Sequence, residues 1–299
     1  MTEWLISLEG TEAGKTVALI LALQAAFLHA VFGALQKRVT DPWTARTVID
    51  ATYATIAAPF AVFVVPWPPT EMWWMFAVVW VIHVAYKVAQ SAAYSAGAYT
   101  VVYPVVRGTG PVFTVVGAGL VFGEHFAPLQ WVGVAMLVGG ILGLAIYNLR
   151  HVIIDRDRLP LALSLAVLTG GIVAVYTTWD AFVIRATENP FTFIAWFFFL
   201  DGLAFPAFYL VRNKGRLPRP FGRLARLGLA GAFTAYASFG GILLATRLDK
   251  VGEAAVLRET SVVFSALLGW LMLGESTGPR RITLICLIAA GAVIVELGG

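Results

Sequence analysis

Charged residues are scarce in this sequence, since Asp, Glu, Lys and Arg together make up 13% of its 299 residues. A soluble domain ordinarily has about a quarter of its residues charged. Hydrophobic residues reach 59%, and the mean hydropathy is +0.81. These values exclude an ordinary water-soluble domain and indicate a chain embedded in a lipid bilayer. The net charge of +4 then reflects loop lysines and arginines, and we expect no nucleic-acid partner.

Cysteine is nearly absent as well. Cys286 is the only one and lies in an apolar stretch, so a disulfide framework is excluded. The first 15 residues carry three glutamates and no basic region, so we expect no cleavable signal peptide. Residues 10–16 (GTEAGKT) resemble a phosphate-binding loop, but they are one residue short between the glycines and follow no strand. With no metal-ligand spacing, nucleophile elbow or dinucleotide fingerprint elsewhere, the sequence predicts no metal, no cofactor and no enzymatic activity.

An internal repeat is the most informative feature that the sequence does have. Residues 103–140 reappear as residues 254–291 at a constant offset, for 258 − 107 = 151. The matches include polar and turn residues, which chance does not supply between apolar segments: Arg107 and Arg258, Thr109 and Thr260, Gly123-Glu124 and Gly274-Glu275, and Pro128 and Pro279. Upstream, residues 37–44 (KRVTDPWT) resemble residues 185–192 (RATENPFT). We therefore divide the chain into two copies of one unit, residues 1–150 and 151–299, an organisation typical of transporters.

Ten segments are long and apolar enough to cross a bilayer, which takes roughly 20 residues per helix. They lie near residues 17–36, 46–66, 72–96, 99–122, 128–148, 160–184, 190–211, 224–246, 252–273 and 280–297. Each half then has five spans, and because five is odd the second copy enters the membrane from the opposite side. The sequence thus predicts an all-α integral membrane protein whose ten transmembrane helices form two five-helix repeats of inverted topology. In such a fold the substrate site lies between the halves near the midplane.

The distribution of lysine and arginine predicts the orientation. Of the 21 in the chain, 14 fall in the five joints on one side of the membrane, with Arg46 counted in the first joint, and four fall on the other side. Loops rich in these residues face the cytoplasm. We therefore expect the joint at residues 212–226 to be cytoplasmic and both termini to lie outside the cytoplasm. The expected location is a bacterial inner membrane.

Charged residues inside membrane spans are unfavourable by a few kcal/mol, so they indicate a cavity or a buried partner. One helical face of the third span carries a polar stripe at spacings of 4, 3 and 4: His83, Lys87, Gln90 and Tyr94. Three basic side chains are predicted to bind the anionic group of a substrate: Lys87, Arg107 and Arg258. Three tyrosines are predicted to contact the rest of it: Tyr94, Tyr103 and Tyr176. Four groups are candidates for coupling transport to proton movement: His83, Asp180, Asp201 and Glu259.

Structural roles remain open for several of these residues. Arg258 and Glu259 would also suit a structural ion pair. His29 and His83 would suit either packing or a proton relay. Asp50 lies close to a predicted helix end, where we expect it to be solvated.

Two further expectations concern helix ends and helix packing. Glu124 and its repeat partner Glu275 are expected to cap the joints in which they lie. Gly139 and Gly143, four residues apart, are expected to allow a neighbouring helix to approach closely.

Residues 103–143 (YPVVRGTGPVFTVVGAGLVFGEHFAPLQWVGVAMLVGGILG) and their copy at 254–291 resemble the EamA-type domain of the drug/metabolite transporter superfamily. The resemblance rests on an early proline or small residue in the fourth helix, Gly-Glu at its end, and a Gln-containing, Gly-rich fifth helix. It extends over both halves. The second copy departs from the first at three places, where Pro104, Pro111 and Gln130 become Ala255, Val262 and Arg281, so the halves are expected to differ in function. The family implies ten helices around a central cavity and secondary transport by alternating access.

The function expected is secondary-active transport of a small organic metabolite with an anionic group, an amino acid or an organic acid, with export favoured by the habit of the family. One alternative is efflux of cationic drugs, with Asp180, Asp201 or Glu259 as the counter-charge. Another is a non-transporting membrane scaffold or a membrane enzyme that acts on lipid. The expected partners are the substrate and the lipid bilayer, and the expected assembly is a monomer or a weak homodimer.

Overall fold

The computed structural model describes residues 2–36, 41–97, 99–151, 157–216, 218, 221–273 and 278–299. Across these residues every regular element is a helix, as the sequence predicts. The first half holds α1 (Thr2–Ser7), α2 (Glu12–Gln36), α3 (Pro42–Pro59), the π-helical turn η1 (Phe60–Val64), the 3-10 turn η2 (Thr70–Met72), α4 (Trp73–Ala96), α5 (Tyr99–Phe122) and α6 (Pro128–His151). The second half holds α7 (Leu159–Ala186), α8 (Pro190–Asp201), α9 (Ala204–Arg212), α10 (Phe221–Ala235), the π-helical turn η3 (Tyr236–Gly240), α11 (Gly241–Leu248), α12 (Val251–Arg258), α13 (Ser261–Leu273) and α14 (Pro279–Leu297).

Eight helical segments of the described chain are long and apolar enough to cross a membrane. They run over Glu12–Gly33, Trp43–Val64, Thr70–Ala96, Val101–Phe122, Pro128–Arg150, Leu159–Ala186, Pro190–Arg212 and Leu224–Leu248, within five residues of the first eight predicted spans. The predicted ninth segment forms two shorter helices, α12 and α13, separated by a turn at Glu259 and Thr260. The tenth forms α14, whose 19 residues include Arg280, Arg281 and Glu296. The chain is an integral membrane protein by these features, whereas ten transmembrane helices in inverted repeats stay a prediction.

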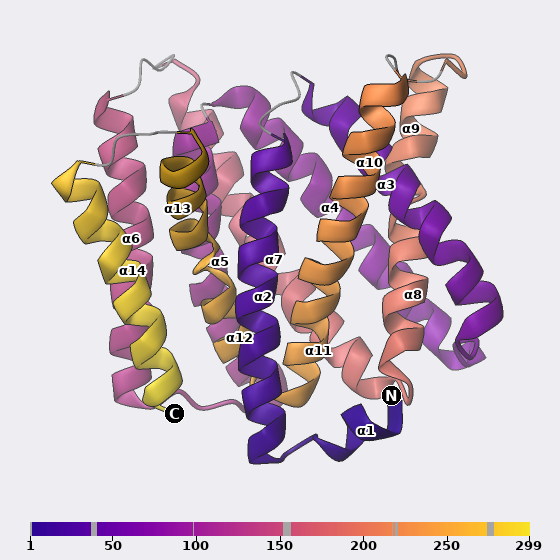
Figure 1. The fold of residues 1–299 in the computed structure, drawn as a ribbon, viewed down its shortest axis with the longest axis horizontal. Helices are drawn as coiled ribbons and strands as arrows, with labels where there is room; N and C mark the ends of the chain where they lie inside the picture. Colours follow the sequence, from indigo (N-terminus) through magenta and orange to yellow (C-terminus); the bar gives the residue numbers. More distant parts are fainter. Residues whose placement is uncertain are drawn as a thin grey trace.

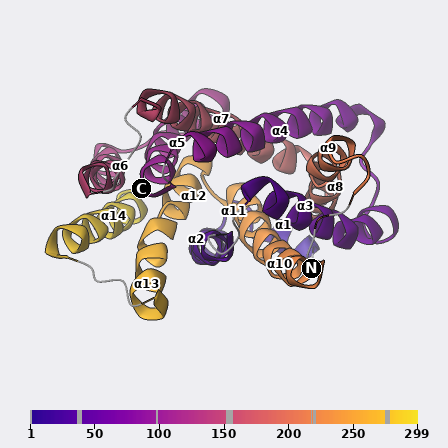
Figure 2. The same ribbon diagram turned by 90° about the horizontal axis from the view of Figure 1, so that it is seen from above.

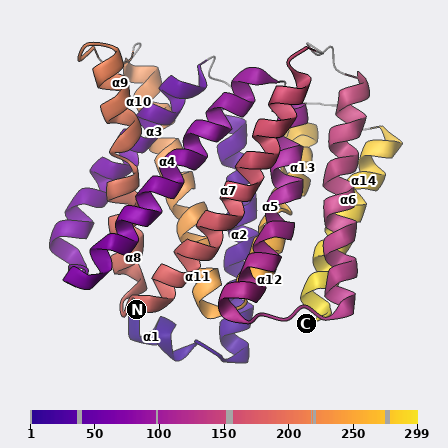
Figure 3. The same ribbon diagram turned by 180° about the vertical axis from the view of Figure 1, so that it is seen from behind.

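The helices run side by side as a bundle, and both termini lie at the same end of it (Figure 1). The short helix α1 lies across that end. Seen from behind, α4, α7, α5 and α6 form the near row (Figure 3). Seen end-on, this row packs over a second one that includes α14, α13, α2 and α10 (Figure 2).

Two helices begin with the same local device. Before α3, the Asp41 side chain accepts hydrogen bonds from the backbone N–H groups of Trp43 and Thr44, each at 3.1 Å. Before α8, the Asn189 side chain accepts one from Phe191 at 3.0 Å. In both places a proline follows the capping residue, where its missing N–H is harmless. These are the segments DPWT and NPFT whose likeness the sequence already suggests.

The helices α6 and α14 pack backbone against backbone. A Cβ at Gly291 would lie 2.6 Å from the carbonyl oxygen of Gly133, and a Cβ at Gly133 would lie 2.7 Å from that of Gly291. Gly140 approaches Leu284 in the same way, with 3.0 Å between its absent Cβ and the Leu284 carbonyl oxygen. Only glycine permits helix axes to come this close.

The expectation for Gly139 and Gly143 holds for one of the two. A Cβ at Gly143 would lie 2.6 Å from Cδ2 of Leu284, so this glycine also serves the contact with α14. A Cβ at Gly139 would have nothing within 4 Å. The prediction for Gly139 is therefore wrong, because its side of α6 faces open space.

Glu124, in the joint between α5 and α6, caps a helix of the other half. Its carboxylate accepts hydrogen bonds from the backbone N–H groups of Val251 at 2.8 Å and Gly252 at 3.0 Å, the first residues of α12. A carboxylate is favoured there by the positive end of the helix dipole. The expectation that Glu124 caps its own joint is therefore wrong, and Glu275 lies outside the described residues.

Candidate functional site

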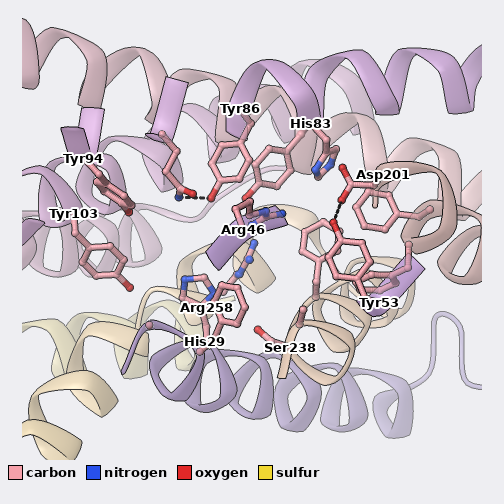
Figure 4. A pocket seen from close by; sticks show the side chains of 18 residues that line it. His29, Arg46, Tyr53, His83, Tyr86, Tyr94, Tyr103, Asp201, Ser238 and Arg258 are labelled. Atoms are coloured by element: carbon pink, nitrogen blue, oxygen red, sulfur yellow. Dashed lines mark hydrogen bonds between the residues drawn. The ribbon is translucent and has the colours of Figure 1, made fainter. Parts of the chain in front are cut away.

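Side chains from both halves of the chain converge on a cavity of about 100 Å³ (Figure 4). It is lined by His29, Phe32, Gly33, Arg46, Tyr53, His83, Tyr86, Gln90, Tyr94, Tyr103, Tyr176, Phe197, Phe198, Asp201, Ala235, Ser238, Phe239 and Arg258. Nine of these 18 residues are Phe or Tyr, so the walls are largely aromatic. The charged residues of the lining are Arg46, Asp201 and Arg258.

Arg258, the last residue of α12, differs from the other buried cations near the cavity. Its side chain is 7% exposed, and its guanidinium carbon lies 5.5 Å from the centre of the Phe239 ring. Within the described part of the chain no carboxylate lies within ion-pair distance of it, and its Nε has no hydrogen-bond partner. A buried guanidinium in this state has donors available for an anion.

Arg107, on α5, already has protein partners. Its Nη1 donates to Oε1 of Glu259 at 2.9 Å, and its Nη2 donates to Nε2 of His29. It is 6% exposed and does not belong to the cavity lining. The alternative in which Glu259 pairs with Arg258 is therefore wrong, because Glu259 reaches across to Arg107 instead. The contact also requires a neutral His29, since Nε2 can accept only when it carries no proton.

Lys87, on α4, lies in a buried cluster of charges beside the cavity. Its Nζ donates to Oδ2 of Asp50 at 2.7 Å and to Oδ2 of Asp201 at 2.8 Å, and it also contacts the Tyr53 hydroxyl at 3.0 Å. The side chain is 1% exposed. Lys87 is thus held by protein carboxylates and is not among the cavity-lining residues, so a direct contact with substrate stays a prediction.

Asp50 completes this cluster from α3. It is fully buried, and its Oδ1 lies 2.8 Å from Nε of Arg46, one turn earlier on the same helix. The expectation of a solvated Asp50 is therefore wrong, because α3 extends to Pro59 and places position 50 in its interior. Arg46 is likewise part of the cavity lining and not of the first joint.

His83 and Asp180 form a separate pair between α4 and α7. Nε2 of His83 lies 2.8 Å from Oδ2 of Asp180, and both side chains are nearly fully buried. The imidazole packs against three aromatic rings, with centroids 4.6 Å from Tyr176, 4.8 Å from Phe197 and 5.6 Å from Phe239. His83 reaches the cavity wall, whereas Asp180 lies behind it.

Residues 160–297, the second half of the chain, match the model of the EamA-like transporter family. The chain belongs to the EamA-like transporters. This membership places it in the drug/metabolite transporter superfamily and makes it a membrane transporter of small molecules.

The fold of this EamA-like protein also occurs among solved structures. One crystal structure superposes with a TM-score of 0.70 over 96% of this chain and 98% of its own length, at 18% sequence identity. At that identity the likeness shows a shared fold alone. A search of curated proteins found no match to the sequence.

The structure brings together most, but not all, of the substrate-binding residues predicted for this EamA-like protein. Tyr94, Tyr103, Tyr176 and Arg258 line one cavity, whereas Arg107 and Lys87 lie beside it in ion pairs. Of the predicted proton-coupling residues, His83 and Asp201 line the cavity, whereas Asp180, paired with His83, and Glu259, paired with Arg107, do not. Their roles in binding and coupling remain predictions.

Several lining residues escaped the sequence argument, among them Arg46, Tyr53, Tyr86, Ser238 and Phe239. A signal for the first two was present: Arg46, Asp50 and Tyr53 are spaced by 4 and 3, which places them on one helical face. Phe239 and Ser238 gave no such signal, because an aromatic or a serine in an apolar span is more often a packing residue. Across the described residues there is no group of three His, Cys, Asp or Glu side chains that could hold a metal ion.

Proposed function

We propose that this EamA-like protein is a secondary-active transporter that carries a small organic metabolite with an anionic group by alternating access. The observation that supports this most directly is Arg258, a buried guanidinium on the cavity wall with no carboxylate partner among the described residues. An unpaired charge inside a bilayer is unfavourable unless an anion completes it. A substrate carboxylate would accept two parallel hydrogen bonds from the guanidinium.

The shape of the cavity supports a small substrate. Its volume of about 100 Å³ is below the roughly 300–1,000 Å³ of pockets for drug-sized ligands. The aromatic walls suit the apolar body of such a molecule, and the hydroxyls of Tyr86, Tyr94 and Tyr103 suit its polar substituents. An organic acid or an amino acid fits this description.

Efflux of cationic drugs is the alternative within transport, and the charge distribution speaks against it. Asp201 contacts Lys87 at 2.8 Å and Glu259 contacts Arg107 at 2.9 Å, so neither carboxylate is available to a cation without a rearrangement. A cationic ligand would also lie against Arg258. A membrane scaffold needs no cavity lined from both halves, and a lipid-modifying enzyme would need a group of catalytic side chains that these lining residues do not supply.

The wider mechanism belongs to the same proposal. Two five-helix repeats of inverted topology would rock about a cavity between them, and the lining drawn from both halves is in keeping with this. We take export across a bacterial inner membrane, with both termini outside the cytoplasm, as the working direction and orientation.

The test is an uptake screen in proteoliposomes with radiolabelled carboxylates, phosphate esters, amino acids and organic cations. For the best substrate, Arg258→Ala should weaken binding by about 1.5–3 kcal/mol, the value of a hydrogen bond to a charged group. Arg258→Lys should recover only part of this, because an ammonium lacks the bidentate fork. Arg280→Ala, at an exposed position of α14, is the matched control and should bind normally. The proposal fails if Arg258→Ala transports anions with wild-type affinity, or if only cations are transported.

A further inference from the structure

The buried charges around the cavity balance one another when both histidines are neutral. Among the described residues, four cations lie there: Arg46, Lys87, Arg107 and Arg258. Four carboxylates lie there as well: Asp50, Asp180, Asp201 and Glu259. A singly charged anion that entered this cavity would leave one negative charge uncompensated inside the bilayer. That state is unfavourable, so a positive charge has to arrive with the anion.

Three of the four carboxylates already contact a lysine or an arginine side chain. Asp50 contacts both Arg46 and Lys87, Asp201 contacts Lys87, and Glu259 contacts Arg107. Asp180 alone, within the described part of the chain, has a histidine as its partner. Its second oxygen, Oδ1, is buried without a hydrogen bond, as is one oxygen of each of the other three carboxylates, so the histidine partner is what distinguishes Asp180. The His83–Asp180 pair is therefore the place where this charge cluster can gain or lose a proton without breaking an ion pair.

His29 cannot bind a proton in the same way. Its Nε2 faces the Nη2 donor of Arg107, so a proton there would put two donors against each other. A proton added to His83 is stabilised, because Nε2 of its ring lies 2.8 Å from the Asp180 carboxylate. The proton would occupy the ring nitrogen that lacks one, and the imidazolium would remain paired with Asp180.

We infer that the His83–Asp180 pair binds one proton for each singly charged anion that binds at Arg258, so that the occupied cavity stays electrically neutral. This inference rests on the proposed function, and it narrows the substrate to monoanions. Phe239 links the two sites, since its ring lies 5.6 Å from the His83 ring and 5.5 Å from the Arg258 guanidinium. An anion at Arg258 lowers the repulsion that a proton on His83 would otherwise meet, and the reverse holds equally.

Other charged and titratable groups face the pair from each helix packed around it. Tyr86 on α4 and Tyr176 on α7 contact the His83 ring, and the charges of Asp201 on α8 and Arg258 on α12 act on Asp180. Lys87 on α4 pairs with Asp201, and Arg46 on α3 lines the same cavity. Lys87 and Asp201 neutralise each other, and Arg46 is paired with Asp50. The charges that remain without a partner of opposite sign in direct contact are then the negative charge of the His83–Asp180 pair and the positive charge of Arg258.

Benzoate is a suitable probe, because it has a single charge and a planar ring that matches the aromatic walls. We would measure radiolabelled benzoate bound to the purified full-length protein by equilibrium dialysis, and protons taken up on binding with an indicator dye in weakly buffered solution. The wild-type protein should take up about one proton per benzoate. Its affinity should fall about tenfold per pH unit once the pair no longer holds its proton in the free protein.

Two substitutions at the pair should have opposite effects. Asp180→Asn removes one negative charge and leaves the cavity positive without a proton, so benzoate should bind at high pH as well as at low pH and with no proton uptake. His83→Gln keeps the carboxylate and removes the imidazole. At each pH at which the wild-type protein takes up a proton with benzoate, this variant should bind benzoate at least tenfold more weakly than the wild-type protein does. A purely structural pair would respond alike to both changes. His125→Gln, an exposed histidine in the α5–α6 joint, is the matched control and should keep the uptake.

The outcomes separate this inference from the proposed function. Wild-type protein that binds benzoate without proton uptake would overturn the inference and leave anion transport standing, provided that Arg258→Ala abolishes the binding. Equal loss of binding in Asp180→Asn and His83→Gln, with both variants folded, would also overturn it. Wild-type protein that binds neither benzoate nor acetate at any pH would overturn both.

Discussion

Replacing Lys87 by methionine should destabilise the folded protein by about 3–5 kcal/mol, the usual effect of removing one partner of a buried ion pair. Methionine is close to lysine in length and volume, so the substitution removes the charge and little else. Asp50 would keep Arg46 at 2.8 Å, whereas Asp201 would lose its contact with a cation. The penalty is therefore mainly that of an unpaired carboxylate at position 201, which is 3% exposed.

This reasoning makes a sharper prediction for a double variant. Asp201→Asn in the Lys87→Met background removes the stranded charge, and the remaining amide oxygen can still accept the hydrogen bond from Tyr53. Most of the lost stability should return, leaving the double variant within about 1–2 kcal/mol of wild type. The two changes should thus be strongly non-additive.

Equilibrium unfolding in mixed detergent micelles, followed by the fluorescence of the ten tryptophans, would measure these free energies. Lys15→Met is the control, because the Lys15 side chain is 55% exposed and its pair with Glu12 should contribute less than about 1 kcal/mol. A loss below about 1 kcal/mol in Lys87→Met would refute the view that Lys87 is held by Asp201. A double variant as unstable as the single one would refute the charge argument.

Other predictions concern the joints, the helix seam and the orientation. Glu124→Ala should lower the free energy of unfolding by about 1–2 kcal/mol, because two N–H groups at the start of α12 lose their acceptor; the same unfolding assay would detect this. Gly291→Val should push α6 and α14 apart and lower the free energy of unfolding by about 1–3 kcal/mol. Gly139→Ala places its new methyl group in open space and should leave the free energy of unfolding unchanged or raise it slightly. Reporter fusions after residue 218 and at the C-terminus should signal from the cytoplasm and from outside it; the opposite pattern would reverse the proposed orientation.

The helices were predictable from the sequence because length and hydrophobicity decide what can cross a bilayer. Eight candidate membrane spans begin and end within five residues of the predicted limits. The ninth segment was predicted as one span, but the chain turns at Glu259 and Thr260 between α12 and α13. Hydropathy averages over about 20 residues and does not register such a break, although two polar residues in an apolar span are a local sign of it.

The ion pairs of the site were much harder to predict. Lys87 is 37 residues from Asp50 and 114 residues from Asp201, so the pairing depends on which helices become neighbours. Apolar spans all look alike in this respect, and the sequence therefore indicated which side chains are costly to bury but not how they combine. Among the cavity-wall residues that carry a charge or a hydroxyl, the sequence indicated Tyr94, Tyr103, Tyr176, Asp201 and Arg258 but not Arg46, Tyr53, Tyr86 and Ser238. The Phe side chains of the wall were not indicated either, because phenylalanine is common on every face of a membrane helix.

The contacts between α6 and α14 are symmetric with respect to the internal repeat. Two sets of close glycine contacts between these helices correspond to each other: Gly140 on Leu284 and Ile288, and Gly291 on Gly133 and Leu137. The repeat offset of 151 converts one set into the other, since 291 − 151 = 140, 284 − 151 = 133 and 288 − 151 = 137. Contacts that exchange in this way are those of an isologous interface, in which one surface meets a second copy of itself about a two-fold axis. Each of the two predicted repeat units thus carries both sides of this interface, which is the arrangement that fusion of a two-fold dimer into one chain would produce.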